Sequence, residues 1–594
     1  MLKNGAFCAT SKLYYNEPMA ELRRAGKLNH VSFNKIPIRK GKSKRLKRLV
    51  YTFLTLGLIS IILGALLYKF GDLYKIYDSL VSSATYKIYY PTIKVYTEQP
   101  DIFSKLTQIT FNDKKRIEFI QDPQKADFTL TFSNTPNQAD FILPVVPCTN
   151  FKATIIEVPQ DLNTVYATPQ LANYATILQR LYNLPNLQTL EDPTQIPQDQ
   201  VALLLLFQIS PNCRVLNTKS GYPLDILYEN KLLEQTLGYS LYLQIRDNKP
   251  DLPKTQAKKL GILKGLITSH TPFVPIQQVQ ESHKVSKITI TGVTAITRGL
   301  LRALNRAQDP YYIVKDLKPI VSNADIVHTS NEVSFKPDCN SISGMRFCSD
   351  EKYFPLLTYL GINLVELTGN HNNDYGSKWN TYTIEKLYKP NNINYFGGGL
   401  NLQDASKPFI TTLPNGVKVG FLGYNVYDTI LNNPGPLAGT DKAGANPFSW
   451  PKVENDIKAL KPQVDYVFVH LQYQECYAYP AYGVLHTGCY NPIPGQTEFF
   501  RKVADLGADF VIGTQAHQPQ KFEKYNNSYI FYGLGNFLFD QIYWPGTRQG
   551  IVLQFYFTQD KLLQIRLIPT WQEKDYRVRP MRPKEAKEFL GYVR

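Results

Sequence analysis

The sequence has little excess charge once its first 48 residues are set aside. Those residues hold 13 Lys or Arg against two Glu, so they carry +11 of the formal net charge of +17 and leave +6 on the other 546 residues. A balance this modest disfavours a general nucleic-acid-binding surface. No tandem repeat or low-complexity tract stands out, and 43% hydrophobic residues exclude wholesale disorder. We therefore expect two or three folded domains and no nucleic-acid partner.

One long uncharged run stands near the N-terminus, from Leu49 to Tyr68. A helix of that length rises about 30 Å, which is the thickness of a bilayer's hydrocarbon core. Basic residues crowd the stretch 39–48 before it, which predicts a cytoplasmic N-terminus. No small-residue cleavage site follows, so an uncleaved signal-anchor is favoured over a signal peptide. We expect a single-pass protein of the cell membrane, with a basic cytoplasmic tail (1–48), an anchor (49–69), a stalk (70–90) and an extracytoplasmic bulk.

Cysteines are also scarce, with seven in the whole chain. Cys8 lies on the expected cytoplasmic side and the other six lie outside, where an even number is typical of disulfides. Proximity in the sequence suggests the pairs Cys339–Cys348 and Cys476–Cys489, which leaves Cys148–Cys213. Their spacings do not resemble a zinc knuckle. Six cysteines allow fifteen pairings, so this assignment stays a hypothesis.

Two further units follow the stalk. Residues 91–285 alternate strand-like runs such as "DFTLTFS" with helix-like runs such as "QLANYATILQRLYN", which indicates a smaller α/β domain. Its order is similar to that of a periplasmic solute-binding lobe, but no ligand signature accompanies it. Residues 286–574 repeat strand, turn and helix, and a basic C-terminal tail (575–594) is expected after them.

Polar residues stand where the apolar strands of the second unit end. Alternate side chains of a strand share a face, so His328, Ser330 and Glu332 point the same way if their strand continues that far. Gln515 and His517 are related in the same way. Four of the chain's eight histidines fall at such ends. The residues at these ends are His328, Ser330, Glu332, Asn370, His371, His470, Gln515 and His517.

Several strands that deposit such residues at one sheet edge build a composite site. Imidazole and carboxylate groups suit zinc, manganese or iron better than calcium. Such an ion polarises a phosphoryl or carbonyl oxygen and activates water. His371, if left unliganded, could protonate a leaving group. Two plainer interpretations stay open: a lone strand-end histidine is often structural, and Asp374 could simply cap the helix that begins in "SKWNTYTIEKLY".

The motifs "ELTGNHNNDYG", "VHLQYQE", "GADFVIGTQAHQPQ" and "YIFYGLGNFLFDQ" resemble those of the CapA family of poly-γ-glutamate capsule synthesis proteins, in the family's order. The similarity covers about residues 286–574. It implies the fold of the calcineurin-like metallophosphoesterase superfamily, an α/β/β/α sandwich with metals at the strand ends. A single membrane anchor with an outward domain also fits that family.

The resemblance implies roles for particular residues. The implied metal ligands are Glu332, Asn370, His470 and His517, with His328 and Gln515 as further candidates. The implied catalytic residues are His371 and Asp374. The other residues expected at this site are Ser330, Glu475, Asn536 and Asp540.

Three positions depart from the family's motifs. Val293 stands where the family has a metal-binding Asp, Gln515 replaces the first His of a His-x-His pair, and Ser330 replaces an Asn. The first two changes remove ligands from a metal pair, for which His328 could compensate. We therefore expect one divalent ion (zinc, manganese or iron) or none.

The main hypothesis is a membrane-anchored CapA-like protein of capsule or envelope polymer biosynthesis with a metal-dependent, hydrolase-like site. Its expected partners are the envelope polymer and other membrane proteins of capsule synthesis. The alternative is a non-catalytic polymer-binding or scaffold protein on a degenerate metallophosphoesterase fold. A third hypothesis, a solute sensor, requires a ligand pocket within residues 91–282.

Overall fold

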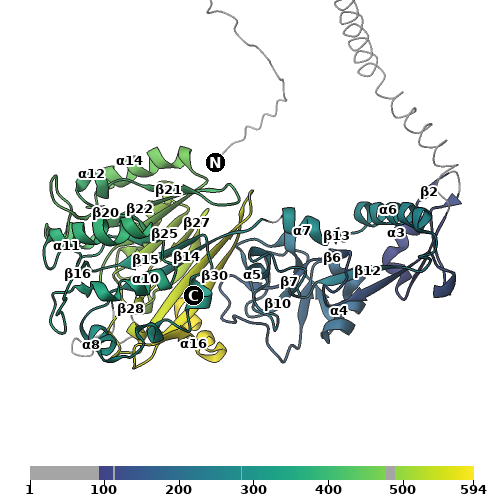
Figure 1. Ribbon diagram of the computed structural model, residues 1–594, viewed down its shortest axis with the longest axis horizontal. Helices are drawn as coiled ribbons and strands as arrows, with labels where there is room; N and C mark the ends of the chain where they lie inside the picture. The colour runs from purple at the N-terminus through teal and green to yellow at the C-terminus, as the bar shows by residue number, and fades with distance from the viewer. Residues whose placement is uncertain (1–91, 112–113, 283, 477–488) are drawn as a thin grey trace, which may run out of the picture. The chain divides into compact units, whose positions relative to one another are not determined.

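The structure, a computed structural model, describes residues 92–594 except 112–113, 283 and 477–488 (Figure 1). The predicted anchor, the tail before it and the stalk lie outside the described residues. Among the helices of the described part, none combines the length and the apolar character needed to cross a membrane. Residues 90–594 form one compact unit, so the two units expected after the stalk are joined by many contacts.

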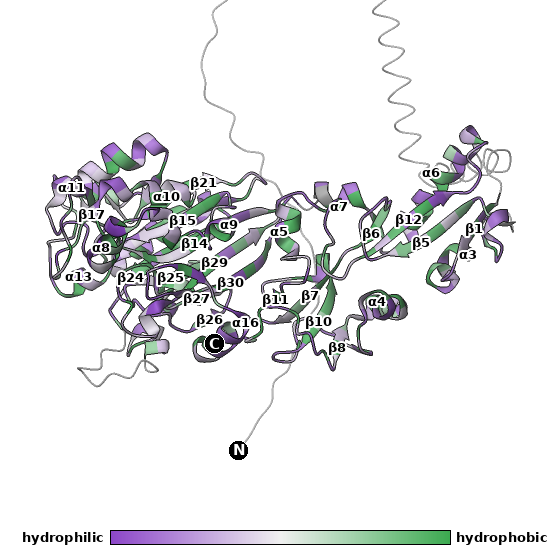
Figure 2. Ribbon diagram, turned by 60° about the horizontal axis from the view of Figure 1, so that its bottom comes forward, coloured by the Kyte–Doolittle hydropathy of each residue, from purple (hydrophilic) through white to green (hydrophobic). Residues whose placement is uncertain are grey.

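Residues 92–285 build two mixed sheets with helices packed against them. In order across the first sheet lie β13 (Val274–Pro275), β6 (Phe141–Leu143), β12 (Leu241–Asp247), β5 (Phe128–Ser133), β1 (Ile93–Thr97) and β4 (Ile117–Phe119). In order across the second lie β11 (Cys213–Val215), β7 (Val145–Asn150), β10 (Val201–Leu205), β8 (Val165–Ala167) and β9 (Leu187–Thr189). The helices are α3 (Ser104–Thr107), α4 (Ala175–Tyr182), α5 (Pro223–Tyr228), α6 (Pro253–His270) and α7 (Ile276–Ser282). Strand β10 is buried at every position, as its continuous apolar sequence predicts (Figure 2).

Residues 286–594 build two main sheets, one of eight strands and one of six. The first contains β19 (Asn394–Phe396), β18 (Leu364–Glu366), β15 (Ile326–Asn331), β14 (Ser286–Thr294), β29 (Gln549–Phe557), β30 (Leu562–Gln572) and β31 (Val578–Pro580), with β28 (Asn536–Leu538) pairing β14. The second contains β21 (Phe409–Thr412), β22 (Lys418–Asn425), β24 (Tyr466–Gln472), β25 (Phe510–Thr514), β27 (Ser528–Phe531) and β26 (Phe522–Tyr525).

These two sheets pack face to face, and helices cover their outer faces. Aromatic residues such as Phe421, Phe468 and Phe555 fill the space between the sheets. Helices α8 (Arg298–Arg306) and α10 (Pro355–Tyr359) bury leucines against the first sheet. Helices α14 (Trp450–Leu460) and α15 (Gln496–Asp505) bury apolar residues such as Ile457 and Phe500 against the second sheet. The order is therefore helix, sheet, sheet, helix, the layering that the resemblance implies.

The C-terminal residues are part of this domain and not a tail. Residues 578–580 form β31 of the first sheet, and α16 (Pro583–Val593) buries Ala586, Phe589, Leu590 and Val593 in the core between the sheets. The basic residues that suggested a tail lie on the outer side of this helix or in ion pairs, such as that of Arg579 with Glu585. An amphipathic helix accounts for both features.

The parallel strands place their carboxyl ends together at one end of the sandwich. In the first sheet β14, β15 and β18 are parallel neighbours, and in the second β22, β24 and β25 are. Gly369 follows β18 and lies so close to Glu332 that a Cβ would come within 2.6 Å of the Glu332 Cα. Only glycine permits this approach, which explains why "ELTG" ends in glycine and why Asn370 and His371 come next to Glu332.

Two disulfides, Cys339–Cys348 and Cys476–Cys489, are present and match two of the pairs that the sequence suggested. The third suggested pair is not formed, because Cys148 and Cys213 are both free and buried. They lie on the adjacent strands β7 and β11, where Cys148 is opposite Val215 and Cys213 is opposite Asn150. The two cysteines are therefore offset by two residues along the ladder and not directly opposite each other.

Candidate functional site

A cavity of about 730 Å³ opens at the carboxyl ends of the strands. Its polar wall includes four residues that the sequence singled out, namely His371, Glu475, His517 and Asp540. Its apolar wall includes Phe347, Phe539, Tyr543 and Trp544, and the disulfide Cys476–Cys489 lies at its side. A concave site with a few convergent polar groups is the usual form of a ligand-binding pocket.

His371 and Asp374 form the central pair of this cavity. His371 Nδ1 lies 2.6 Å from Asp374 Oδ2, and the ring stacks on Phe347 at a centroid distance of 4.0 Å. Asp374 also accepts a hydrogen bond from the Phe347 backbone N–H at 2.7 Å, which fixes its carboxylate. The cap interpretation of Asp374 is wrong, because helix α11 (Ser377–Tyr382) begins after Gly376 without a side-chain cap. Asp374 instead orients the imidazole.

Two glutamates, Glu332 and Glu475, lie near the His371–Asp374 pair. Glu332 is 2% exposed, and neither of its carboxylate oxygens has a hydrogen-bond partner. Burial raises the pKa of Glu332 to about 7 and also raises the pKa of Glu475. Burial alone would lower the pKa of His371, but the hydrogen bond that its ring donates to Asp374 and the charge of Glu332 outweigh it and raise that pKa. A carboxyl group with a pKa near 7, such as that of Glu332, can both accept and donate a proton at physiological pH.

Arg298 and Asp540 also line this cavity and form an ion pair. Asp540 Oδ1 accepts hydrogen bonds from Arg298 Nε at 3.0 Å and Nη2 at 2.5 Å, while its Oδ2 accepts one from the Gly299 N–H at 3.1 Å. The guanidinium also lies over the rings of Phe347 and Phe539, at 4.4 and 5.1 Å. Asp540 therefore positions Arg298, which presents a fixed positive charge beside the cavity.

Asp540→Asn is expected to destabilise the protein by about 2 kcal/mol, because it weakens a bidentate, charge-assisted pair. Urea unfolding of the purified protein measures this change. Asp441→Asn, the same substitution at an exposed position, serves as the control and should change the free energy of unfolding by less than about 0.5 kcal/mol. Equal effects of the two substitutions would show that the Asp540 pair adds nothing to stability.

The residues present do not match the metal pair of the superfamily, in line with the three departures noted in the sequence. Val293 is buried between Ser330 of β15 and Asn536 of β28, so an aliphatic side chain occupies the expected ligand position. Asn370 Oδ1 and Gln515 Oε1 both accept hydrogen bonds from the Gln472 side-chain amide. With Val293 in place of a carboxylate and both amide oxygens bound to Gln472, the ligand set of a two-metal site is incomplete.

His517 forms a hydrogen bond with Asn536. His517 Nδ1 lies 2.9 Å from Asn536 Oδ1, and burial lowers the pKa of His517 to about 4. The imidazole is therefore neutral at physiological pH. Gln515 and His517 both follow the end of β25 and have positive φ angles of 79° and 57°, so the strand alternation expected for them does not apply.

His328 and His470, two histidines expected beside Glu332, lie in a different part of the fold. Strand β15 ends at Asn331, so Glu332 leaves the strand and lies among His371, Glu475 and Asp374. His328 and His470 point into the space between the two sheets and lie together with Glu366. The single composite site predicted from the sequence is therefore two groups, one at the cavity and one inside the sandwich.

Three residues of these groups were not predicted from the sequence. For two of them, the sequence pattern contains a feature that could have identified them. Glu366 is a carboxylate within the apolar run "INLVEL", which is unusual for a buried strand. Gln472 lies two residues beyond His470 and therefore on the same face of β24. Arg298 had no comparable signal, because its role depends on Asp540, 242 residues away.

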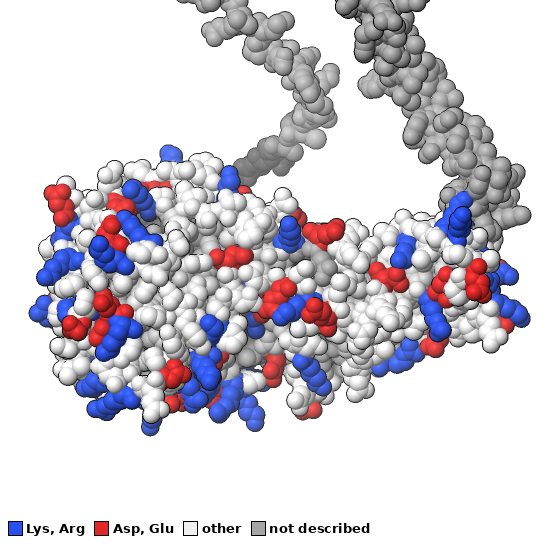
Figure 3. All heavy atoms as spheres, viewed as in Figure 1, with Lys and Arg blue, Asp and Glu red and all other residues white. Residues whose placement is uncertain are grey.

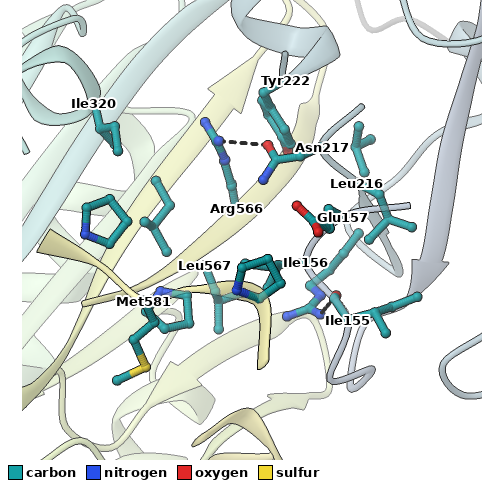
Figure 4. A pocket seen from close by; sticks show the side chains of 16 residues that line it. Ile155, Ile156, Glu157, Leu216, Asn217, Tyr222, Ile320, Arg566, Leu567 and Met581 are labelled. Atoms are coloured by element: carbon teal, nitrogen blue, oxygen red, sulfur yellow. Dashed lines mark hydrogen bonds between the residues drawn. The ribbon is translucent and has the colours of Figure 1, made fainter. Parts of the chain in front are cut away.

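Two further cavities lie outside this end of the sandwich. One of about 200 Å³ lies where residues 155–222 meet β30, and Figure 4 shows Arg566 directed at Asn217 there, with a hydrogen bond of 2.9 Å. The other, of about 770 Å³, is lined entirely by residues 134–239. The solute-sensor hypothesis requires a closed pocket in this part of the chain, whereas this cavity is open to solvent. On the face shown in Figure 3, acidic and basic side chains are interspersed.

Residues 287–541 match the family model for the bacterial capsule synthesis protein PGA_cap. The capsule biosynthesis protein CapA of Bacillus anthracis is 26% identical over 349 residues, which are 56% of this chain and 80% of that protein. The PGA biosynthesis protein CapA of Bacillus subtilis strain 168 is 25% identical over 260 residues, 43% of this chain and 64% of that protein. The chain thus spans just under two thirds of the second relative.

Among solved structures, the calcineurin-like phosphoesterase YfkN of Bacillus subtilis aligns with 48% of this chain and 90% of its own, with 12% identity and a TM-score of 0.28. A putative 5'-nucleotidase of Staphylococcus aureus aligns with 52% of this chain and 58% of its own, with 12% identity and a TM-score of 0.32. The four motifs quoted from the sequence all lie within the matched segment 287–541. Residues 287–541 of this chain therefore match the family model of the bacterial capsule synthesis protein PGA_cap, and the chain is similar in sequence to the CapA proteins of two Bacillus species.

Proposed function

We propose that this protein acts in the synthesis of a capsule or envelope polymer and that the cavity around His371 is its active site. The protein is anchored in the cell membrane by residues 49–69, and its described part lies outside the cell, where it meets the polymer and other membrane proteins of capsule synthesis. The observation that carries the catalytic part is the pair His371–Asp374, which lies at 2.6 Å near the buried Glu332 and beside an open cavity that Glu475 also lines.

The chemistry proposed is acid–base transfer at a bond of the polymer or its precursor. His371, held by Asp374, donates a proton to the leaving group. Glu475, which lines the same cavity, accepts the proton of the attacking group. Arg298 holds negative charge of the substrate in place, since its guanidinium faces the cavity and is fixed by Asp540. This chain's own side chains carry each of these steps.

A non-catalytic role in polymer binding or scaffolding is the second candidate. Its support is Val293, which stands where the family has a ligand, and the amide contacts of Gln472 with Asn370 and Gln515. In this role the aromatic wall of Phe347, Phe539 and Trp544 would hold the polymer without turning it over. The two candidates share the partner and differ in whether His371 matters.

Deleting the gene from the organism that encodes it is expected to reduce the surface polymer to background. The amount per cell is measured after extraction and hydrolysis. Expression of the full chain from a plasmid should restore it, which separates loss of this protein from effects on neighbouring genes. Unchanged polymer in the deletion strain would refute both candidates.

A further inference from the structure

The buried group inside the sandwich consists of His328 on β15, Glu366 on β18 and His470 on β24. All three side chains have zero exposure. β15 and β18 are parallel neighbours in the first sheet, whereas β24 lies in the second. The group therefore joins the two sheets across the core. It does not line the cavity around His371, which is a separate place in the fold.

The three side chains offer donor atoms that lie close together. His470 Nδ1 is 3.1 Å from Glu366 Oε2, His328 Nε2 is 3.9 Å from the same oxygen, and one ligand atom from each residue lies within 4.8 Å of the other two. Among the His, Cys, Asp and Glu side chains of the described residues, these three have ligand atoms close enough together to hold a metal ion. Ligation at about 2.1 Å places donors about 3.4 Å apart, so closure around an ion needs side-chain shifts of about 1 Å.

Several of these atoms lack any other partner. Neither nitrogen of His328 has a hydrogen bond, and Nε2 of His470 has none. Leaving such a buried polar atom unsatisfied costs about 1–3 kcal/mol, and native proteins avoid it. The rings of Phe396 and Phe421 lie near His470, at centroid distances of 5.1 and 6.2 Å, and offer no hydrogen bond. A cation bound by one nitrogen of each ring would give His328, which has no hydrogen bond at either nitrogen, a partner for one of them.

Neighbouring residues also orient this group in a way that favours binding of a cation. Glu366 Oε1 accepts hydrogen bonds from the hydroxyls of Thr368 and Thr514, which fix the carboxylate and leave Oε2 directed at the histidines. Two imidazoles and one carboxylate are a donor set that suits zinc.

We propose that His328, Glu366 and His470 bind one zinc ion that ties the two sheets together. The ion would be structural, because its ligands are fully buried and none of them reaches the cavity. This site differs from the one predicted from the sequence, which joined His328 and His470 to Glu332 and His517 at the strand ends. The proposal is independent of any activity at His371.

The test is the zinc content of the purified full-length protein, measured by elemental analysis after dialysis against zinc and then against buffer. About one zinc per chain is expected for the wild type and for His517→Ala, the control at the cavity. Less than about 0.1 is expected for Glu366→Gln and for His328→Ala. Zinc should also raise the midpoint of thermal unfolding of the wild type and leave that of Glu366→Gln unchanged.

Two results would overturn the proposal. One is a wild-type protein that binds no zinc, and the other is zinc that is retained in both core variants but lost in His517→Ala. If the core variants fail to fold, X-ray absorption of the zinc-loaded wild type decides the matter. Two imidazoles without sulfur are expected, and a single imidazole would rule the core group out.

Discussion

Replacing His371 by Ala is expected to lower the amount of surface polymer by about 10²- to 10⁴-fold, the usual worth of a general acid. His371 lines the cavity, and its Nδ1 is bound to Asp374, so its Nε2 is the nitrogen left to serve a substrate. The measurement is polymer per cell in the deletion strain that expresses the variant, with the protein level checked by immunoblot. Asp374→Asn should cause a smaller loss, since it removes the orientation of the ring but leaves the ring in place.

The control is His270→Ala, the same change at an exposed position in the last turn of α6. It should leave polymer output unchanged. Normal output from His371→Ala at a normal protein level would exclude acid catalysis by this residue and favour the scaffold role. The thermal midpoint of each purified variant separates lost chemistry from lost folding.

Replacing Asp225 by Asn is expected to destabilise the protein by about 3 kcal/mol, because it removes the counter-charge of a buried cluster. Asp225 on α5 pairs with Lys287 at 2.7 Å and with Arg566 at 2.9 Å, and it accepts a hydrogen bond from the Tyr556 hydroxyl at 2.8 Å. The Lys287 side chain is only 1% exposed. Without the carboxylate, the two cations would face each other between residues 92–285 and the sandwich.

The pH dependence of this effect has a defined sign. Burial would raise the pKa of Asp225, but the charges of Arg566 and Lys287 outweigh it, and the pKa is lowered overall. A lowered carboxyl pKa contributes stability above the pKa of the unfolded state, about 3.9, and that stability is lost as the pH falls below it. The difference between wild type and Asp225→Asn should therefore be full at pH 7 and shrink below about pH 4.

Urea unfolding at several pH values measures both quantities. Asp560→Asn, at an exposed position in the turn between β29 and β30, is the matched control and should change stability by less than about 0.5 kcal/mol. A loss for Asp225→Asn no larger than that of the control would mean that the cluster contributes no net stability. Such a result occurs when desolvation cancels the ion pairing.

The fold of residues 286–574 was largely predictable because its signals are local. Apolar strand runs such as "VDYVFV" are followed by polar residues and helices, and this alternation is typical of parallel sheets with helices outside. The end of the domain was missed. Basic residues after 574 suggested a tail, whereas the apolar spacing of Ala586, Phe589, Leu590 and Val593 is that of a helix with one buried face.

The sequence by itself determined which residue types the strand ends deliver, since each strand's apolar run and its polar end are encoded in a few adjacent positions. Only the tertiary structure decided which of them meet. Alternation along a strand defines a face but not the neighbour on that face, so His328 and Glu332, four residues apart, belong to different groups once β15 ends at Asn331. Glu366, His328 and His470 come together from three strands and two sheets, and that meeting depends on packing between segments up to 142 residues apart, which no local pattern records.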